Sequence, residues 1–151
     1  GLHLFVTERD PARGLRGADC FHCHGGNLFS NHQFMNNGLP EVPGDLGRVE
    51  VTGKETDRGK FKVPSLRNIA LTAPYMHDGR FTTLEQVVDH YDSGVRRSKT
   101  LDPNLAKHPD SGLGLSPEDK AALVAFLKTL TDEEFVSQPS NVTTNQLSKA
   151  Y

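Results

Sequence analysis

Two stretches of the chain have the spacing of apolar residues that is typical of amphipathic helices. In the first, four side chains fall at positions i, i+3, i+4 and i+7 and therefore share one helix face: Leu84, Val87, Val88 and Tyr91. Thr82 and Thr83 each begin a capping-box pattern, and Gly94 is a natural C-terminal stop. The pattern predicts a helix over residues 83–92.

The second stretch begins with a strong helix-start signal. Ser116 can cap the helix, Pro117 suits the first helical position, and Glu118 and Asp119 put negative charge in the first turn. Four apolar side chains then form one stripe: Leu123, Phe126, Leu127 and Leu130. We expect a helix over residues 117–130.

The remaining chain is mainly loop. A short apolar stretch over residues 2–6 reads as part of a helix, and Asp10-Pro11 ends it because the residue before a proline resists helical conformation. Residues 40–59 and 95–114 read as loops, with a short strand expected at residues 48–52. The fold class is therefore all-α with long loops. We expect one domain over residues 1–136 and a polar tail over residues 137–151.

Composition limits the functions that this chain can have. Its 151 residues include 35% hydrophobic residues, 14 Gly and 9 Pro, and the formal net charge is −2. This composition predicts a small hydrophobic core for a chain of this length, and a large buried apolar cofactor would complete such a core. The charge and the absence of a basic run argue against nucleic-acid binding. No apolar stretch reaches the roughly 20 residues that span a membrane.

The two cysteines of the chain belong to one motif, Cys20-Phe21-His22-Cys23-His24. Cys-x-x-Cys-His is the attachment motif of c-type haem, because each thiol can add to one vinyl group of the porphyrin. The adjacent His24 can then bind the iron as proximal ligand. A redox cysteine pair and half of a zinc site are the alternatives. A redox pair needs no following histidine, and a zinc site usually requires a second ligand pair at metal spacing. Haem c is attached outside the cytoplasm, so with a start at Gly1 we expect a processed or truncated form of an exported, periplasmic protein.

The iron needs either a sixth ligand or an open site opposite His24. Met76 is the usual choice in cytochromes, while Tyr91 would supply an anionic phenolate that lowers the reduction potential. Four histidines are further candidates: His32, His77, His90 and His108. Arg67 has the guanidinium that would pair with a haem propionate.

A long motif resembles a known family. Residues 61–79 read FKVPSLRNIALTAPYMHDG, followed by Thr83-Leu84-Glu85 and His90-Tyr91. This pattern is similar to the C-terminal haem domain of bacterial dihaem cytochrome c peroxidases, and within that superfamily to the MauG-like branch. The resemblance extends from the haem motif to about Leu130 and implies a cytochrome c-like fold.

The resemblance also implies roles for individual residues. Cys20 and Cys23 would hold the haem and His24 would bind its iron. Tyr91 matches the position where MauG-like members place a tyrosine ligand, which favours it over Met76. Thr72 and Pro74 match positions whose backbone carbonyls bind calcium between the two domains of the family, and such carbonyls are suitable hard ligands.

The chain departs from the family by having one haem motif and no tryptophan. The peroxide-reactive haem of the family lies in another domain. We therefore expect an electron-relay domain that needs a second haem domain or chain and a redox partner protein, and that is not peroxidatic alone. A free-standing monohaem cytochrome with His24 and Met76 as ligands is the alternative. A haem-based sensor or an oxidase with an open iron site is a third hypothesis.

Overall fold

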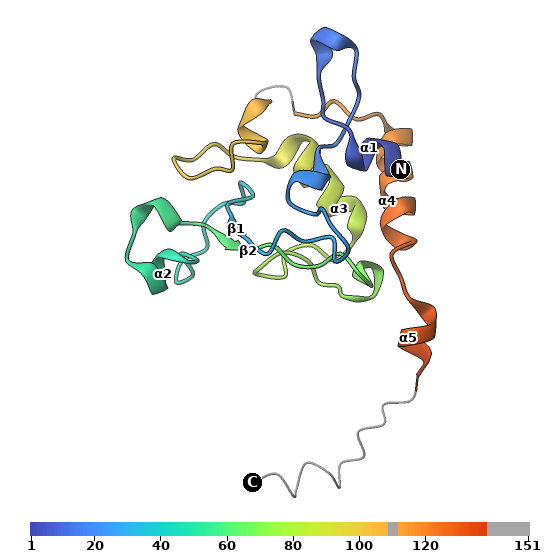
Figure 1. Ribbon diagram of the computed structural model, residues 1–151. Helices are drawn as coiled ribbons and strands as arrows, with labels where there is room; N and C mark the ends of the chain where they lie inside the picture. The colour runs from blue at the N-terminus through green and yellow to red at the C-terminus, as the bar shows by residue number, and fades with distance from the viewer. Residues whose placement is uncertain (109–111, 139–151) are drawn as a thin grey trace, which may run out of the picture.

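The computed structural model describes residues 1–108 and 112–138. Within them the α-helices are α1 (Leu2–Val6), α2 (Val49–Thr52), α3 (Leu84–Asp89), α4 (Pro117–Lys128) and α5 (Glu133–Ser137) (Figure 1). Short 3-10 turns lie at Pro11–Arg13, Cys20–His22, Glu55–Asp57, Ile69–Leu71 and Leu105–Lys107, and a π-helical turn lies at His90–Gly94. Among the described residues the only sheet pairs β1 (Phe34–Met35) with β2 (Phe61–Lys62) in antiparallel register. The prediction of an all-α fold with long loops is confirmed.

Helix α3 forms where the capping box predicts it. The hydroxyl of Thr83 accepts a hydrogen bond from the backbone N–H of Gln86, whose side-chain oxygen accepts one from the N–H of Thr83. Leu84 and Val88 are buried, as the apolar spacing predicts. The last turn of the predicted helix is not α-helical in the structure, because the chain widens there into the π-helical turn that carries Tyr91. Such turns are frequent at functional sites.

Helix α4 also follows its sequence signals. The side chain of Ser116 accepts from the N–H of Asp119, and the carboxylate of Asp119 accepts from the N–H of Ser116, which completes a second capping box. Leu123 and Leu127 of the predicted stripe are buried, and Phe126 packs against Phe5 of α1 with ring centroids 5.1 Å apart.

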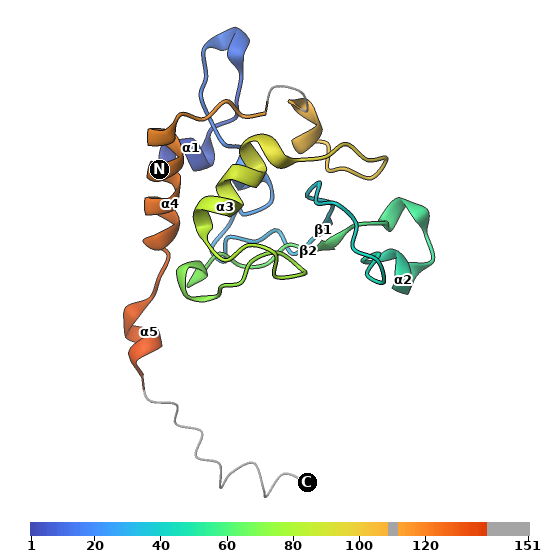
Figure 2. The same ribbon diagram turned by 180° about the vertical axis from the view of Figure 1, so that it is seen from behind.

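Helices α1, α3 and α4 build the hydrophobic core. Its buried members are Leu4, Phe5, Ala18, Leu66, Tyr75, Leu84, Val88, Leu115, Leu123, Val124 and Leu127. Several apolar side chains are only partly buried against this core, including Cys20, Phe21, Phe29, Phe81 and Val87. The first two belong to the 3-10 turn Cys20–His22, which with Cys23 is called the cysteine turn below. Figures 1 and 2 both show α4 on one side of the molecule and α2 on the other, with α3 and the sheet between them.

The strand expected at residues 48–52 is wrong, because this segment forms the helix α2. Gly53, at a φ of 67°, donates its N–H to the carbonyl of Val49 and so closes one helical turn. Val49 is buried while Val51 is 90% exposed.

The described helices do not include one that is both long and apolar enough to cross a bilayer. Residues 139–151, most of the predicted polar tail, lie outside the described residues, so the domain boundary near residue 136 stays a prediction.

Replacing Gly17 with alanine is expected to destabilise the fold by about 3 kcal/mol. A Cβ at this position would overlap the backbone carbonyl of Thr7, which the chain cannot move cheaply. That carbonyl accepts from the N–H of Asp19 at 3.1 Å, while Ala18 donates to Leu4 at 2.8 Å, so the overlap would separate α1 from the cysteine turn. Denaturant unfolding of the purified protein measures the loss.

Gly14→Ala is the matched control. Gly14 has a φ of 67° but no atom within 4 Å of its Cβ position, so only backbone strain of about 1 kcal/mol is expected. Equal losses in the two variants would contradict the steric explanation.

Candidate haem-binding site

The two cysteines lie on one short 3-10 turn. Cys20 begins the turn Cys20–His22, and Cys23 directly follows it and donates its N–H to the carbonyl of Cys20. Side chains at i and i+3 of a 3-10 helix point in the same direction. Both thiols are free and partly buried. The turn thus presents both sulfur atoms to one side, as two thioether bonds to a single porphyrin require.

Burial raises the pKa of the Cys20 thiol to about 12 and that of Cys23 to about 11. In both cases desolvation is the largest cause, and the negative charge of Asp19 adds to it. Reactive redox cysteines need a stabilised thiolate, which means a lowered pKa. The environment of these thiols therefore disfavours a redox cysteine pair, one of the alternatives to haem attachment.

His24 is held by the backbone around it. Its Nδ1 lies 3.0 Å from the backbone carbonyl of Phe29, and the backbone of Pro64 makes a second hydrogen bond with the ring. Burial lowers the pKa of His24, which favours the neutral imidazole that binds a metal. Second contacts of this kind commonly fix the orientation of a ligating histidine.

Tyr91 lies close to the thiols although 67 or more residues separate them in sequence. Burial raises the pKa of Tyr91 to about 12. The negative charges of the Cys23 and Cys20 thiolates also raise this pKa, whereas a side-chain hydrogen bond with Asn37 lowers it. The effects of the two thiolates require the phenol to be near both sulfur atoms. The structure thus brings Tyr91 to the cysteine turn.

Met76 reaches the same neighbourhood through Asn37. The side-chain nitrogen of Asn37 donates to the Sδ atom of Met76 at 3.4 Å, and the backbone carbonyl of Asn37 lies 2.9 Å from Nε2 of His90. Both candidate sixth ligands therefore contact one amide side chain. The sequence offered no signal for Asn37, because its partners lie far along the chain.

Three of the other candidate histidines have partners elsewhere. His77 stacks on Phe61 with ring centroids 3.7 Å apart, and His90 is buried against the carbonyl of Asn37. His108 lies 3.1 Å from the guanidinium of Arg9 and 3.0 Å from its backbone carbonyl. These contacts occupy both ring nitrogens of His108 and one ring nitrogen of His90.

Arg67 and the two predicted calcium ligands lie on loops. The Nε of Arg67 donates to the carbonyl of Asn27 at 3.0 Å, which attaches it to the loop after the haem motif. Thr72 ends the 3-10 turn Ile69–Leu71, and Pro74 follows a cis peptide bond with Ala73. Propionate binding by Arg67 and calcium binding by the carbonyls of Thr72 and Pro74 stay predictions.

Comparisons with known proteins identify relatives of the chain. The family model described as cytochrome c matches residues 12–131. The chain is 37% identical over 162 residues to the cytochrome-c peroxidase IdrP2 of Denitromonas iodatirespirans, covering 88% of this chain and 42% of the relative. It is 35% identical over 132 residues to the methylamine utilization protein MauG of Methylorubrum extorquens, covering 86% and 34% respectively.

Solved structures show the same relationship. A MauG-like protein associated with microbial copper homeostasis superposes with a TM-score of 0.66 at 41% identity, over 81% of this chain and 45% of that one. The dihaem peroxidase BthA of Burkholderia thailandensis shares the fold, with a TM-score of 0.69 at 22% identity over 93% of this chain and 44% of that one. The chain thus spans less than half the length of these proteins.

Proposed function

Since this chain belongs to the cytochrome c family and has cytochrome-c peroxidases and MauG proteins as relatives, we propose that it is a haem c electron-relay domain of a peroxidase or MauG-like protein. The observation that carries the proposal is the convergence of both thiols, the anchored His24 and the half-buried Tyr91 on one place in the fold. A covalently bound haem c supplies a one-electron iron couple there.

The cysteine turn would hold the haem and set its orientation. Cys20 and Cys23 would each form one thioether bond, and Nε2 of His24 would bind the iron while the carbonyl of Phe29 holds Nδ1. The partly buried rings of Phe21, Phe29 and Phe81 would cover the macrocycle and exclude water. Exclusion of water lowers the local dielectric constant and so strengthens the influence of nearby charges on the iron.

Tyr91 would be the sixth ligand. Its phenol is buried and near the thiols, and burial keeps it protonated in the absence of a cation. A bound metal ion reverses this preference, because its positive charge favours the phenolate. Tyr91 would thus lose its proton when it binds iron, and the amide of Asn37 would hydrogen-bond the resulting oxygen. An anionic ligand of this kind stabilises the ferric state and gives a low reduction potential.

The chain spans 42% of one peroxidase relative and 34% of a MauG relative. In the proposed relay role, the reaction with peroxide would belong to a second haem domain or a partner chain. Thr72 and Pro74 would contribute carbonyl oxygens to a calcium ion near that junction. The protein would be exported, because haem c is attached outside the cytoplasm.

We expect the haem-containing chain to turn over hydrogen peroxide well below the roughly 10 s⁻¹ that is the median for enzymes. The reason is that His24 and Tyr91 would both be ligands of the haem iron, which would leave peroxide no open position. A steady-state assay with a reduced donor measures this rate. Turnover at or above that median would contradict the relay role.

A second candidate function is a free-standing electron carrier with His24 and Met76 as ligands. The observation in its favour is the contact between Met76 Sδ and Asn37, the residue that also hydrogen-bonds Tyr91. A shift of the loop around Met76 could replace the phenol by the thioether. The ligand test in the Discussion separates the two functions.

A further inference from the structure

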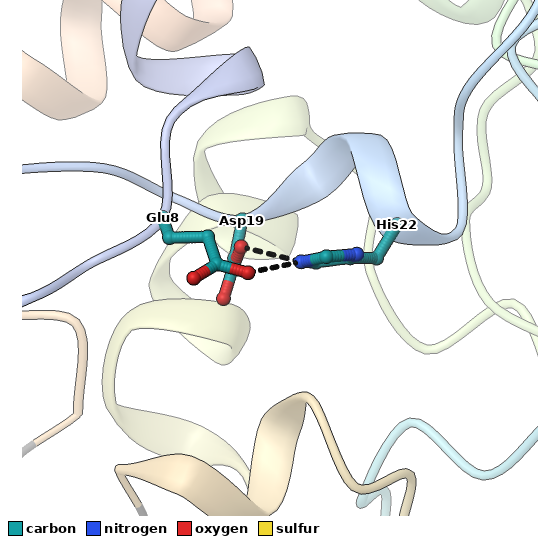
Figure 3. Close-up of side chains that lie close together, drawn as sticks. All are labelled: Glu8, Asp19 and His22. Atoms are coloured by element: carbon teal, nitrogen blue, oxygen red, sulfur yellow. Dashed lines mark hydrogen bonds and ion pairs between the residues drawn. The ribbon is translucent and has the colours of Figure 1, made fainter.

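Three side chains of metal-ligating type meet beside the cysteine turn. Glu8 lies in the segment after α1, Asp19 directly precedes the turn Cys20–His22, and His22 is its last residue. Figure 3 shows the imidazole pointing at both carboxylates, with Nε2 lying 2.8 Å from Oε1 of Glu8 and 3.1 Å from Oδ1 of Asp19. The haem-binding role of the motif uses Cys20, Cys23 and His24 and leaves this cluster unexplained.

The three ligand atoms are close enough to share one ion. They all lie within 4.8 Å of one another. Zinc binds imidazole nitrogen at about 2.0–2.1 Å and carboxylate oxygen at about 2.0–2.2 Å, which places two ligands of a tetrahedral ion about 3.3 Å apart. The observed separations of 2.8 and 3.1 Å therefore need to open by only a few tenths of an ångström to admit the ion.

Asp19 supplies an independent sign that the cluster has room for a ligand, because one of its buried oxygens has no hydrogen-bond partner among the described residues. Its side chain is only 7% exposed, and its Oδ1 atom is buried without a hydrogen bond from any described residue. The proximity of His22 does not remedy this, because the single hydrogen that Nε2 can carry is shared with the closer Glu8. Buried carboxylate oxygens are normally satisfied by hydrogen bonds or by metal ions.

Lys107 marks the position as favourable for positive charge. Its Nζ atom lies 3.2 Å from Oε1 of Glu8 and 3.6 Å from Oδ2 of Asp19. The side chain of Lys107 is 37% exposed and can therefore move into solvent when another cation takes its place. A divalent ion would neutralise both carboxylates, whereas one ammonium group neutralises half of their charge.

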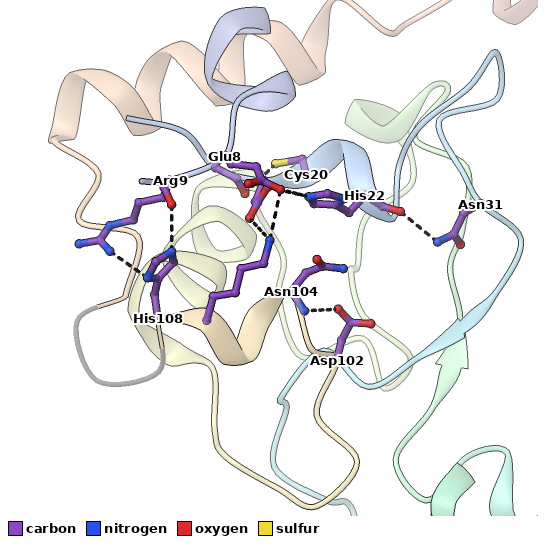
Figure 4. A network of polar contacts seen from close by, with 11 residues as sticks. Glu8, Arg9, Cys20, His22, Asn31, Asp102, Asn104 and His108 are labelled. Atoms are coloured by element: carbon purple, nitrogen blue, oxygen red, sulfur yellow. Dashed lines mark hydrogen bonds and ion pairs between the residues drawn. The ribbon is translucent and has the colours of Figure 1, made fainter. Parts of the chain in front are cut away.

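The position of His22 is supported from several sides. The ring of Phe21 lies 4.1 Å from the imidazole between centroids, and the side chain of Asn31 donates to the backbone carbonyl of His22 at 3.2 Å. Figure 4 shows these contacts of Glu8, His22 and Asn31 as part of a wider polar network that reaches Arg9 and His108. A ligand held in this way loses little conformational freedom when a metal binds.

We propose that Glu8, Asp19 and His22 form a binding site for a divalent ion of the zinc class, separate from the haem iron, with Lys107 as the group that the ion displaces. One imidazole and two carboxylates are a donor set that suits zinc, with a fourth position for water. Calcium is disfavoured because it takes 6–8 oxygen ligands.

Equilibrium dialysis of the haem-containing protein against Zn²⁺ tests the site. We expect one tightly bound zinc per chain, at least tenfold weaker binding in His22→Gln and in Glu8→Gln, and tighter binding in Lys107→Met, where the competing cation is gone. His3→Gln is the matched control, since His3 lies on α1 outside the cluster, and it should bind zinc as the parent does.

Visible spectra check that each variant still holds its haem, and Glu8→Gln keeps the test valid if His22→Gln does not attach haem, because Glu8 lies outside the motif. If the four side chains form only an ion-pair network, neither the parent protein nor Lys107→Met should bind zinc. This result would overturn the proposal. So would unchanged zinc affinity in Glu8→Gln, or weaker binding in Lys107→Met.

Discussion

Changing Cys20 and Cys23 together to alanine is expected to remove all covalently bound haem from the polypeptide. The 3-10 turn presents both sulfur atoms to one side, and they are the only cysteines of the chain, so no other residue can form the thioether bonds. Haem staining after denaturing electrophoresis should show a strong band for the parent chain and none for the double variant. Staining that survives would exclude attachment through these residues.

His24→Ala is the informative companion to this experiment. Its chain should still stain for haem, because the thioethers and the iron bond are separate links. Its visible spectrum should nevertheless change completely, because the imidazole that would bind the iron has been removed. An unchanged spectrum in His24→Ala would show that another residue is the proximal ligand.

The second large effect is expected at Tyr91. Tyr91→Phe removes the phenolate oxygen but keeps the ring that fills the buried space, so the iron should become open or take another ligand. Loss of an anionic ligand should raise the reduction potential by on the order of 0.1 V, within the roughly 0.8 V range that axial ligands span. Spectroelectrochemical titration measures both the spectrum and the potential.

Met76→Leu is the control, since it removes the Sδ atom that contacts Asn37 and preserves the apolar volume. Its spectrum and potential should stay close to those of the parent. If instead Met76→Leu loses a sulfur-to-iron charge-transfer band while Tyr91→Phe changes nothing, Met76 is the ligand and the chain is a simple electron carrier.

The sequence succeeds where a feature depends on neighbouring residues. Both capping boxes, at Thr83 and Ser116, involve partners three residues apart, and both predicted helices are present. The strand expected at residues 48–52 fails because a strand needs a partner from elsewhere in the chain. Without one, the segment closes a single helical turn at Gly53.

The residues of the candidate site likewise fall into those that the sequence identifies and those that only the tertiary structure brings together. By itself the sequence determined the cysteine turn and His24, because the chemistry of haem attachment requires these residue types within five positions of one another. Only the tertiary structure decided that Tyr91 lies near the thiols, that Asn37 contacts both candidate sixth ligands, and that Glu8 contacts both His22 and Lys107. Those contacts join residues from 14 to 99 positions apart, and packing of α1, α3 and the loops, rather than local backbone preference, brings them together.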